Sequence, residues 1–188
     1  SGEIKIIKNK ENRGLPYSVN TGIRNATGKF IVRVDADDFV SEKFLEFLLF
    51  YLDNYPTKDA VSCDYVLIDE EGNYISRKSA ISEPIACGIM FKKDNIFDIG
   101  LYNEEFLTLE DKEFALRFTK KFTIENLPLP LYRYRRHSAN MTNDIENLEK
   151  YEMKLNKWFC WCLESIRGEI MINLKELYFI AEIGVNHE

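Results

Sequence analysis

Residues 29–38, KFIVRVDADD, join a β-rich apolar run to a turn that carries three carboxylates. The mostly apolar run 30–34 predicts an interior strand, and Asp35, Asp37 and Asp38 follow it directly. Carboxylates at the carboxyl end of such a strand lie where open α/β sheets bind ligands. Their hard oxygen atoms suit Mg²⁺ or Mn²⁺, which would neutralise a bound diphosphate. The alternative is an acidic turn that is solvated and binds no ligand.

Strands and helices alternate on both sides of this turn. We expect strands over 4–7, 60–69, 74–79, 88–91 and 122–127, and helices over 16–25, 41–55, 110–122 and 145–166, with a short helix closing at Gly100. Ser41 is the expected N-cap of its helix, and Glu71-Gly72-Asn73 joins the second and third strands as a hairpin. Pro128 and Pro130 predict a bend before the segment 132–137. The alternation indicates α/β architecture with a mixed sheet.

Composition narrows the class of protein. A chain of 188 residues with 45% hydrophobic residues is able to bury a core. The net charge of −6 argues against a nucleic-acid partner and favours a small molecule or a protein. Four scattered cysteines without a CxxC pair suggest neither a zinc site nor a disulfide framework, so we expect a reducing, cytosolic setting. Neither a signal peptide nor an apolar run of about 20 residues is visible.

Two other kinds of site contain an acidic turn of this type, and the residues that follow the turn distinguish them. An EF-hand loop would need an acidic or amide side chain at Phe39 and a glycine at Val40, so that site is not expected. A phosphatase that forms an aspartyl-phosphate also begins with a strand and DxD, but its motif continues with Gly-Thr, whereas Asp38-Phe39 stands here. The acidic turn is therefore better explained by its neighbouring motifs.

Those motifs occur in a fixed order along most of the chain. They are Asn12-x-Gly14, Asn20-x-Gly22-Ile23, Ala26-x-Gly28, Phe30-Ile31, the turn 35–38, and the stretches 87–93, 98–104 and 110–117. In order and separation they resemble the central block of the family 2 glycosyltransferases over about residues 3–142. The resemblance implies a GT-A (Rossmann-like) mixed-sheet domain. It also implies an N-terminally truncated domain, because the family's opening strand-helix-strand, which holds the nucleotide base, is absent.

The same resemblance assigns the site residues. That family transfers a sugar with inversion from a nucleotide-diphosphate donor to a glycan or lipid-linked acceptor, using Mn²⁺ or Mg²⁺. It implies Asp37 and His137 as metal ligands and Asp111 as the general base. Donor-binding roles fall to these residues: Asn20, Asp35, Asp38 and Arg136. Val19 stands where many members carry arginine, which leaves the base preference open.

Several of these assignments have structural alternatives. Glu110 and Asp111 could be ordinary first-turn helix charges, and the helix dipole would favour the charged form of Asp111 and keep it a weak base. His137 could equally be structural. Gly88 and Met90 resemble an acceptor-side loop, but plain strand packing explains them as well. Inversion itself needs one base opposite the leaving group and no nucleophile, which agrees with the assignment of Asp111.

The chain divides into three expected segments: a partial core at 1–142, a helical segment at 143–170, and a linker with a barrel strand at 171–188. Residues 179–187, FIAEIGVNH, resemble the first barrel strand of sialic acid synthases. We therefore expect a fusion chain that serves surface polysaccharide biosynthesis in a nonulosonic-acid context, in the cytoplasm or at the inner membrane face. The rival interpretation is a non-catalytic carbohydrate-binding or scaffolding domain.

Overall fold

The computed structural model describes residues 4–138, 140 and 144–165. The elements in chain order are α1 (Leu15–Asn25), β1 (Phe30–Val32), β2 (Phe39–Val40), α2 (Phe44–Asn54), β3 (Ala60–Ile68), β4 (Tyr74–Lys78), β5 (Met90–Lys92), α3 (Lys93–Asp98), α4 (Glu110–Thr119), β6 (Ile124–Arg135) and α5 (Ile145–Ser165). Most expected helices and strands are present. The predicted tail strand at 179–187 lies outside the described residues.

Six strands form one mixed sheet in the order β1-β5-β3-β6-β2, with β4 paired to β3. The pairing of β3 with β6 is parallel, and the other pairs are antiparallel. This arrangement confirms the predicted α/β class with a mixed sheet. The short β2 pairs with β6, placing Phe39 opposite Arg133 and Val40 opposite Tyr132. That pairing brings the acidic turn, residues 35–38, against the carboxyl end of β6.

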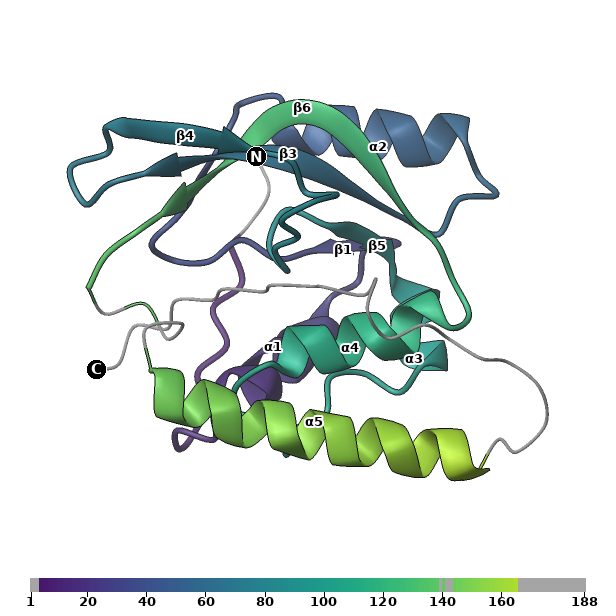
Figure 1. Ribbon diagram of the computed structural model, residues 1–188. Coiled ribbons are helices and arrows are strands. Elements are labelled where there is room, and N and C mark those ends of the chain that lie inside the picture. The colour runs from purple at the N-terminus through teal and green to yellow at the C-terminus, as the bar shows by residue number, and fades with distance from the viewer. Residues whose placement is uncertain (1–3, 139, 141–143, 166–188) are drawn as a thin grey trace.

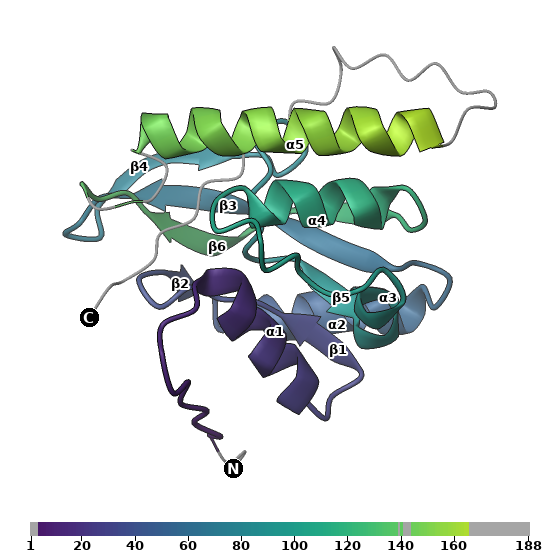
Figure 2. The same ribbon diagram turned by 90° about the horizontal axis from the view of Figure 1, so that it is seen from below.

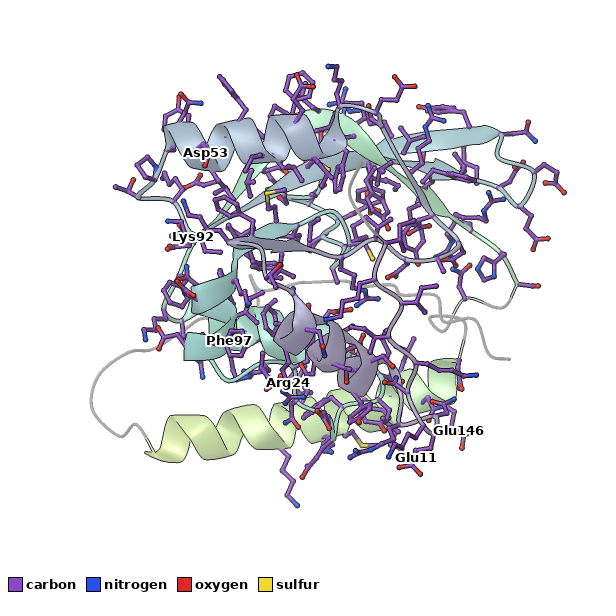
Figure 3. All side chains as sticks on the ribbon, turned by 180° about the vertical axis from the view of Figure 1, so that it is seen from behind. Glu11, Arg24, Asp53, Lys92, Phe97 and Glu146 are labelled. Carbon is purple, nitrogen blue, oxygen red and sulfur yellow. The ribbon has the colours of Figure 1, made fainter. Side chains whose placement is uncertain are left out.

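Helices cover both faces of the sheet. Figure 1 shows α2 above the sheet and α1, α3 and α4 below it, and Figure 2 shows α5 lying along α4. Phe44, Leu48 and Leu52 of α2 are buried at helical spacing against one apolar cluster, which includes Tyr132 and Tyr134 of β6. A second cluster joins α1, α3 and α4 to the other face. Figure 3 shows that α2, labelled at Asp53, and α5, labelled at Glu146, lie on opposite sides of the molecule.

Two strand predictions are wrong. Residues 4–7 form no strand, and Ile4 and Ile6 are 91% and 88% exposed, because no described strand pairs with them. The run 30–34 yields only the three residues of β1, which pair with β5 and end the sheet order rather than lying inside it. An apolar run indicates that side chains are buried, but it does not indicate whether the strand has a neighbouring strand on one side or on both.

Two local details also differ. Pro128 and Pro130 do not end a strand, because β6 runs through them: Pro130 pairs with Asp64 of β3, and extra β6 residues lie on either side of that pair. Such a bulge accommodates proline, which has no backbone N–H to donate to the neighbouring strand. Lys43, not Ser41, is the N-cap of α2, and Ser41 lies two residues before it. Within the described part of the chain, no helix is long and apolar enough to cross a membrane.

Candidate active site

Tyr132 organises the acidic turn from beneath. Its hydroxyl accepts a hydrogen bond from the backbone N–H of Asp35 at 3.1 Å and donates one to Oδ2 of Asp38 at 2.6 Å. The backbone N–H of Arg135 donates to the other oxygen of Asp38 at 2.8 Å. Burial raises the pKa of the Asp38 carboxyl to about 6, although the two hydrogen bonds oppose the rise. The end of β6 therefore holds the conformation of the turn.

Asp37 and His137, the two predicted metal ligands, lie together although 100 residues separate them. Nε2 of His137 is 2.8 Å from Oδ2 of Asp37, and both side chains are largely buried. One carboxylate and one imidazole form a donor set that a divalent cation such as Mn²⁺ accepts. Oxygen atoms of Asp35 and Asp38 also cluster with Sγ of Cys87, all within 4.8 Å of one another. The residues present thus fit a cation at this turn.

Arg33 is the site residue that the sequence analysis missed. Its Nε and Nη2 donate to the two oxygens of Asp35 at 2.6 and 2.9 Å, and its Nη1 donates to Oδ1 of Asp111 at 3.1 Å. Nη1 also lies 3.7 Å from Oε1 of Glu110. The sequence does indicate it, because Arg33 is the one charged residue within the apolar run 30–34. Side chains alternate along a strand, so residues 33 and 35 lie on the same face. One buried guanidinium therefore joins the acidic turn to the start of α4.

Glu110 and Asp111 open α4 and are 1% and 4% exposed. Burial raises the pKa of Asp111 to about 6, against the opposing charge of Arg33. Burial and the charge of Asp111 raise the pKa of Glu110 well above its ordinary value. The expectation that the helix dipole keeps Asp111 a weak base is therefore wrong, because desolvation outweighs the dipole. Leu109, which precedes the pair, has a φ of 60°, a conformation that bulky residues adopt at a cost in free energy.

Asp111 has one carboxylate oxygen available for chemistry. Oδ1 binds Arg33, whereas Oδ2 is buried and has no hydrogen-bond partner among the described residues. Asp111 also lines a small cavity of about 40 Å³, here called the Asp111 cavity, whose walls include Ile85, Ile89 and Phe114. A buried carboxylate with a raised pKa is suited to accept a proton from a hydroxyl group bound beside it.

The remaining predicted donor residues lie elsewhere. Asn20 is 1% exposed, and its amide bonds the backbone of Tyr102 in both directions, each at 2.9 Å, and Oε1 of Glu104 at 3.0 Å. These contacts fasten α1 to the segment before α4. Arg136 lines a second cavity together with Lys78 and Glu83. The donor-binding roles of Asn20 and Arg136 stay predictions.

Gly88 and Met90 have clear packing roles. Gly88 has a φ of 75°, and a Cβ there would lie 3.2 Å from the ring of Tyr132. Met90 is buried in β5 and pairs with Val32 and Val61. The neighbouring Cys87 is a buried free thiol that donates to Oδ2 of Asp35 at 3.0 Å. The segment before β5 therefore contacts both Tyr132, through Gly88, and the acidic turn, through Cys87.

Comparison with known proteins gives a consistent result. The family model described as Glycosyl transferase family 2 matches residues 1–126. An uncharacterized glycosyltransferase of Haemophilus influenzae is 26% identical over 79% of this chain and 53% of its own length, and one of Rickettsia prowazekii is 28% identical over 94% and 61%. The chain thus spans between half and two thirds of these curated relatives.

Solved structures share the fold at low identity. S. aureus TarS 1–349 in complex with UDP-GlcNAc aligns with a TM-score of 0.62 and 16% identity, over 74% of this chain and 44% of that one. The mannosyltransferase PcManGT from Pyrobaculum calidifontis, in complex with GDP-Man and Mn²⁺, aligns with a TM-score of 0.52 and 20% identity, over 69% and 38%. At this identity the likeness establishes the GT-A architecture.

Proposed function

The chain belongs to glycosyl transferase family 2, and from this membership we propose that it forms the core of an inverting glycosyltransferase. Its donor would be a nucleotide-diphosphate sugar, and its acceptor a hydroxyl group of a glycan or a lipid-linked saccharide. Two structural neighbours support the donor class, since TarS is solved with UDP-GlcNAc and PcManGT with GDP-Man. The fold likeness alone does not choose between these nucleotides.

The acidic turn would hold the donor's diphosphate through a cation. Asp37 and His137 are its proposed ligands, with Asp38 held close by Tyr132 and Arg135. When bound, Mn²⁺ or Mg²⁺ supplies positive charge that stabilises the departing diphosphate. Asp35 would face the donor ribose from the same turn. Because Arg33 binds both oxygens of Asp35, this carboxylate is poorly placed to act as a phosphatase nucleophile.

Asp111 would act as the general base. As the acceptor oxygen attacks the anomeric carbon, Oδ2 of Asp111 takes the hydroxyl proton and the bond from that carbon to the diphosphate oxygen breaks. A single displacement of this kind inverts the anomeric configuration. Arg33 would position Asp111 by holding its other oxygen. The observation that carries the proposal is that the guanidinium of Arg33 binds both Asp111, the proposed base, and Asp35 on the donor side.

The experiment has a binding step and a turnover step. We would titrate the protein by calorimetry with UDP, GDP, dTDP and CMP, each with and without Mn²⁺, and repeat the titration with Asp37→Asn. Metal-dependent binding that the variant loses would support the donor site. With the nucleotide identified, Asp111→Asn should lower kcat about 100-fold or more. Asp53→Asn, an exposed carboxylate on α2 (Figure 3), is the matched control and should leave kcat unchanged.

A rival proposal is a non-catalytic carbohydrate-binding or scaffolding domain. It predicts glycan binding in the absence of turnover, with no dependence on Asp111. Surface polysaccharide biosynthesis in a nonulosonic-acid context, a fusion with a synthase, and a cytoplasmic or inner-membrane location are finer proposals that rest on the sequence resemblances.

A further inference from the structure

A second cavity of about 220 Å³ lies between the β3–β4 hairpin, the segment that follows β4, and the end of β6. We call it the Tyr134 cavity, and its polar lining consists of Tyr65, Lys78, Glu83, Tyr134 and Arg136. This space is large enough for the acidic end group of a ligand. These residues come from three separate parts of the chain, so the fold and not a single loop builds the cavity.

The hydroxyl group of Tyr134 is the unusual feature of this lining. Tyr134 is 2% exposed, and its hydroxyl has no hydrogen-bond partner among the described residues. The hydroxyl of neighbouring Tyr65, in contrast, donates to the carbonyl oxygen of Glu83 at 2.9 Å. A buried hydroxyl without a partner costs folding free energy, and such groups point to a missing ligand or to a functional role.

The charged side chains that line the cavity favour an anionic ligand, although the carboxylates of Asp35 and Asp38 also act on the Tyr134 hydroxyl. Nζ of Lys78 binds the carboxylate of Glu83 at 2.8 Å, which holds the ammonium group at the wall of the cavity. Arg136 adds a second positive charge from the end of β6, so the lining carries two cations and one carboxylate. An ammonium, a guanidinium and a phenol hydroxyl are all donors, and a carboxylate or phosphate accepts from all three.

We propose that the Tyr134 cavity is an acceptor subsite that binds a carboxylate or phosphate group of the molecule to be glycosylated. This inference rests on the proposed function, because it assumes that Asp111 receives the acceptor's proton. Ile85 lines both the Tyr134 cavity and the Asp111 cavity, so the two hollows share a wall. One acceptor could therefore anchor its acidic group at Tyr134 and extend its reacting hydroxyl toward Asp111. A carboxylate would come from an acidic sugar, and a phosphate from a phosphorylated or lipid-linked one.

The test compares three probes of similar size by calorimetry: methyl glucuronide, glucose 1-phosphate and methyl glucoside. We expect at least one acidic probe to bind at least tenfold more tightly than methyl glucoside, and which of them does so identifies the source of the anion. Tyr134→Phe and Lys78→Met should each weaken that probe at least fivefold. Lys43→Met, which removes an exposed lysine paired with Glu46 on α2, is the matched control and should change nothing. Thermal unfolding of each variant checks its fold, and Tyr134→Phe loses no hydrogen bond within the described chain.

Three results would overturn the inference. The first is equal binding of all three probes, and the second is acidic-probe binding that neither variant changes. The third is a Lys78→Met variant that loses metal-dependent nucleotide binding by the same factor, which would assign the cavity to the donor diphosphate. Asp37→Asn separates this inference from the proposed function, because it should abolish nucleotide binding and leave acidic-probe binding intact. Acidic-probe binding without any nucleotide binding in the unmodified chain would support the cavity and count against the transferase proposal.

Discussion

Nη1 of Arg33 lies 3.1 Å from Oδ1 of Asp111, although 78 residues separate them in the chain. The same guanidinium binds both oxygens of Asp35. One buried cation thus donates hydrogen bonds to two carboxylates that belong to different halves of the proposed site. The proposed base and the acidic turn are therefore parts of one electrostatic unit.

Removing this cation should destabilise the fold. Arg33→Met leaves Asp35, Glu110 and Asp111 buried without their shared positive charge, and we expect a loss of about 3–5 kcal/mol in the free energy of unfolding. Urea denaturation measures this loss. Arg13→Met is the matched control, since Arg13 is half-exposed and lies 3.9 Å from Glu104, and it should cost under about 1 kcal/mol. A cost for Arg33→Met as small as that of the control would show that the buried pairs contribute little.

The rate of transfer should depend on pH through Asp111. A general base works in its deprotonated form, and burial raises the pKa of Asp111 to about 6. We expect kcat/KM to be flat above that pH and to fall about tenfold per unit below it. A pH–rate profile measures the inflection. An acid limb that lay near pH 4, the ordinary range of a solvated aspartate, would contradict the role of burial.

Glu110 should make the protein less stable as pH rises. Its folded-state pKa is raised above that of the unfolded chain, so the folded protein keeps a proton that the unfolded chain releases. Stability is then fully present below the unfolded pKa of about 4.5 and declines by up to about 1.4 kcal/mol per pH unit above it. Glu110→Gln should remove the contribution of Glu110 to this decline, leaving those of Asp38 and Asp111, and should stabilise the protein at pH 7. Unfolding free energies from pH 4 to 8 test it, and parallel curves for both proteins would disprove it.

Gly88→Ala should cost more than Gly72→Ala. Both glycines have positive φ angles, 75° and 89°, so alanine is strained at either position by about 1–2 kcal/mol. Only at Gly88 would the added Cβ meet another group, the ring of Tyr132 at 3.2 Å, and nothing lies within 4 Å at Gly72. The difference between the two unfolding free energies therefore reports the contact beneath the acidic turn. Equal costs would mean that the ring moves aside freely.

Most of the local structure could be read from sequence patterns. Phe44, Leu48 and Leu52 predicted the buried face of α2, and Glu71-Gly72-Asn73 predicted the β3–β4 turn. These signals act over a few residues, where periodicity and turn chemistry suffice. The strand expected at 4–7 is absent because a strand also needs a partner. The strand end expected at Leu127 is wrong because pairing with β3 continues through the bulged residues.

The carboxylates of the candidate site were also visible in the chain, but their environment was not. Asp37 and Asp111 stood out by position at a strand end and a helix start, whereas Arg33 resembled a polar interruption of an apolar run. Its role depends on Asp111, which only the packing of α4 brings within hydrogen-bond distance. The raised pKa of Asp111 has the same origin, since desolvation is a property of the surrounding fold.

The linear chain therefore determined the class of the fold, its principal elements and the acidic residues at their ends, because those features arise from short-range periodicity and chain chemistry. The tertiary structure alone decided which distant groups share a charge or a cavity. Arg33 with Asp111, Asp37 with His137, and Lys78 with Tyr134 are each brought together by sheet pairing and helix packing. Electrostatic interaction and desolvation depend on distance in space, and the folded sheet sets that distance.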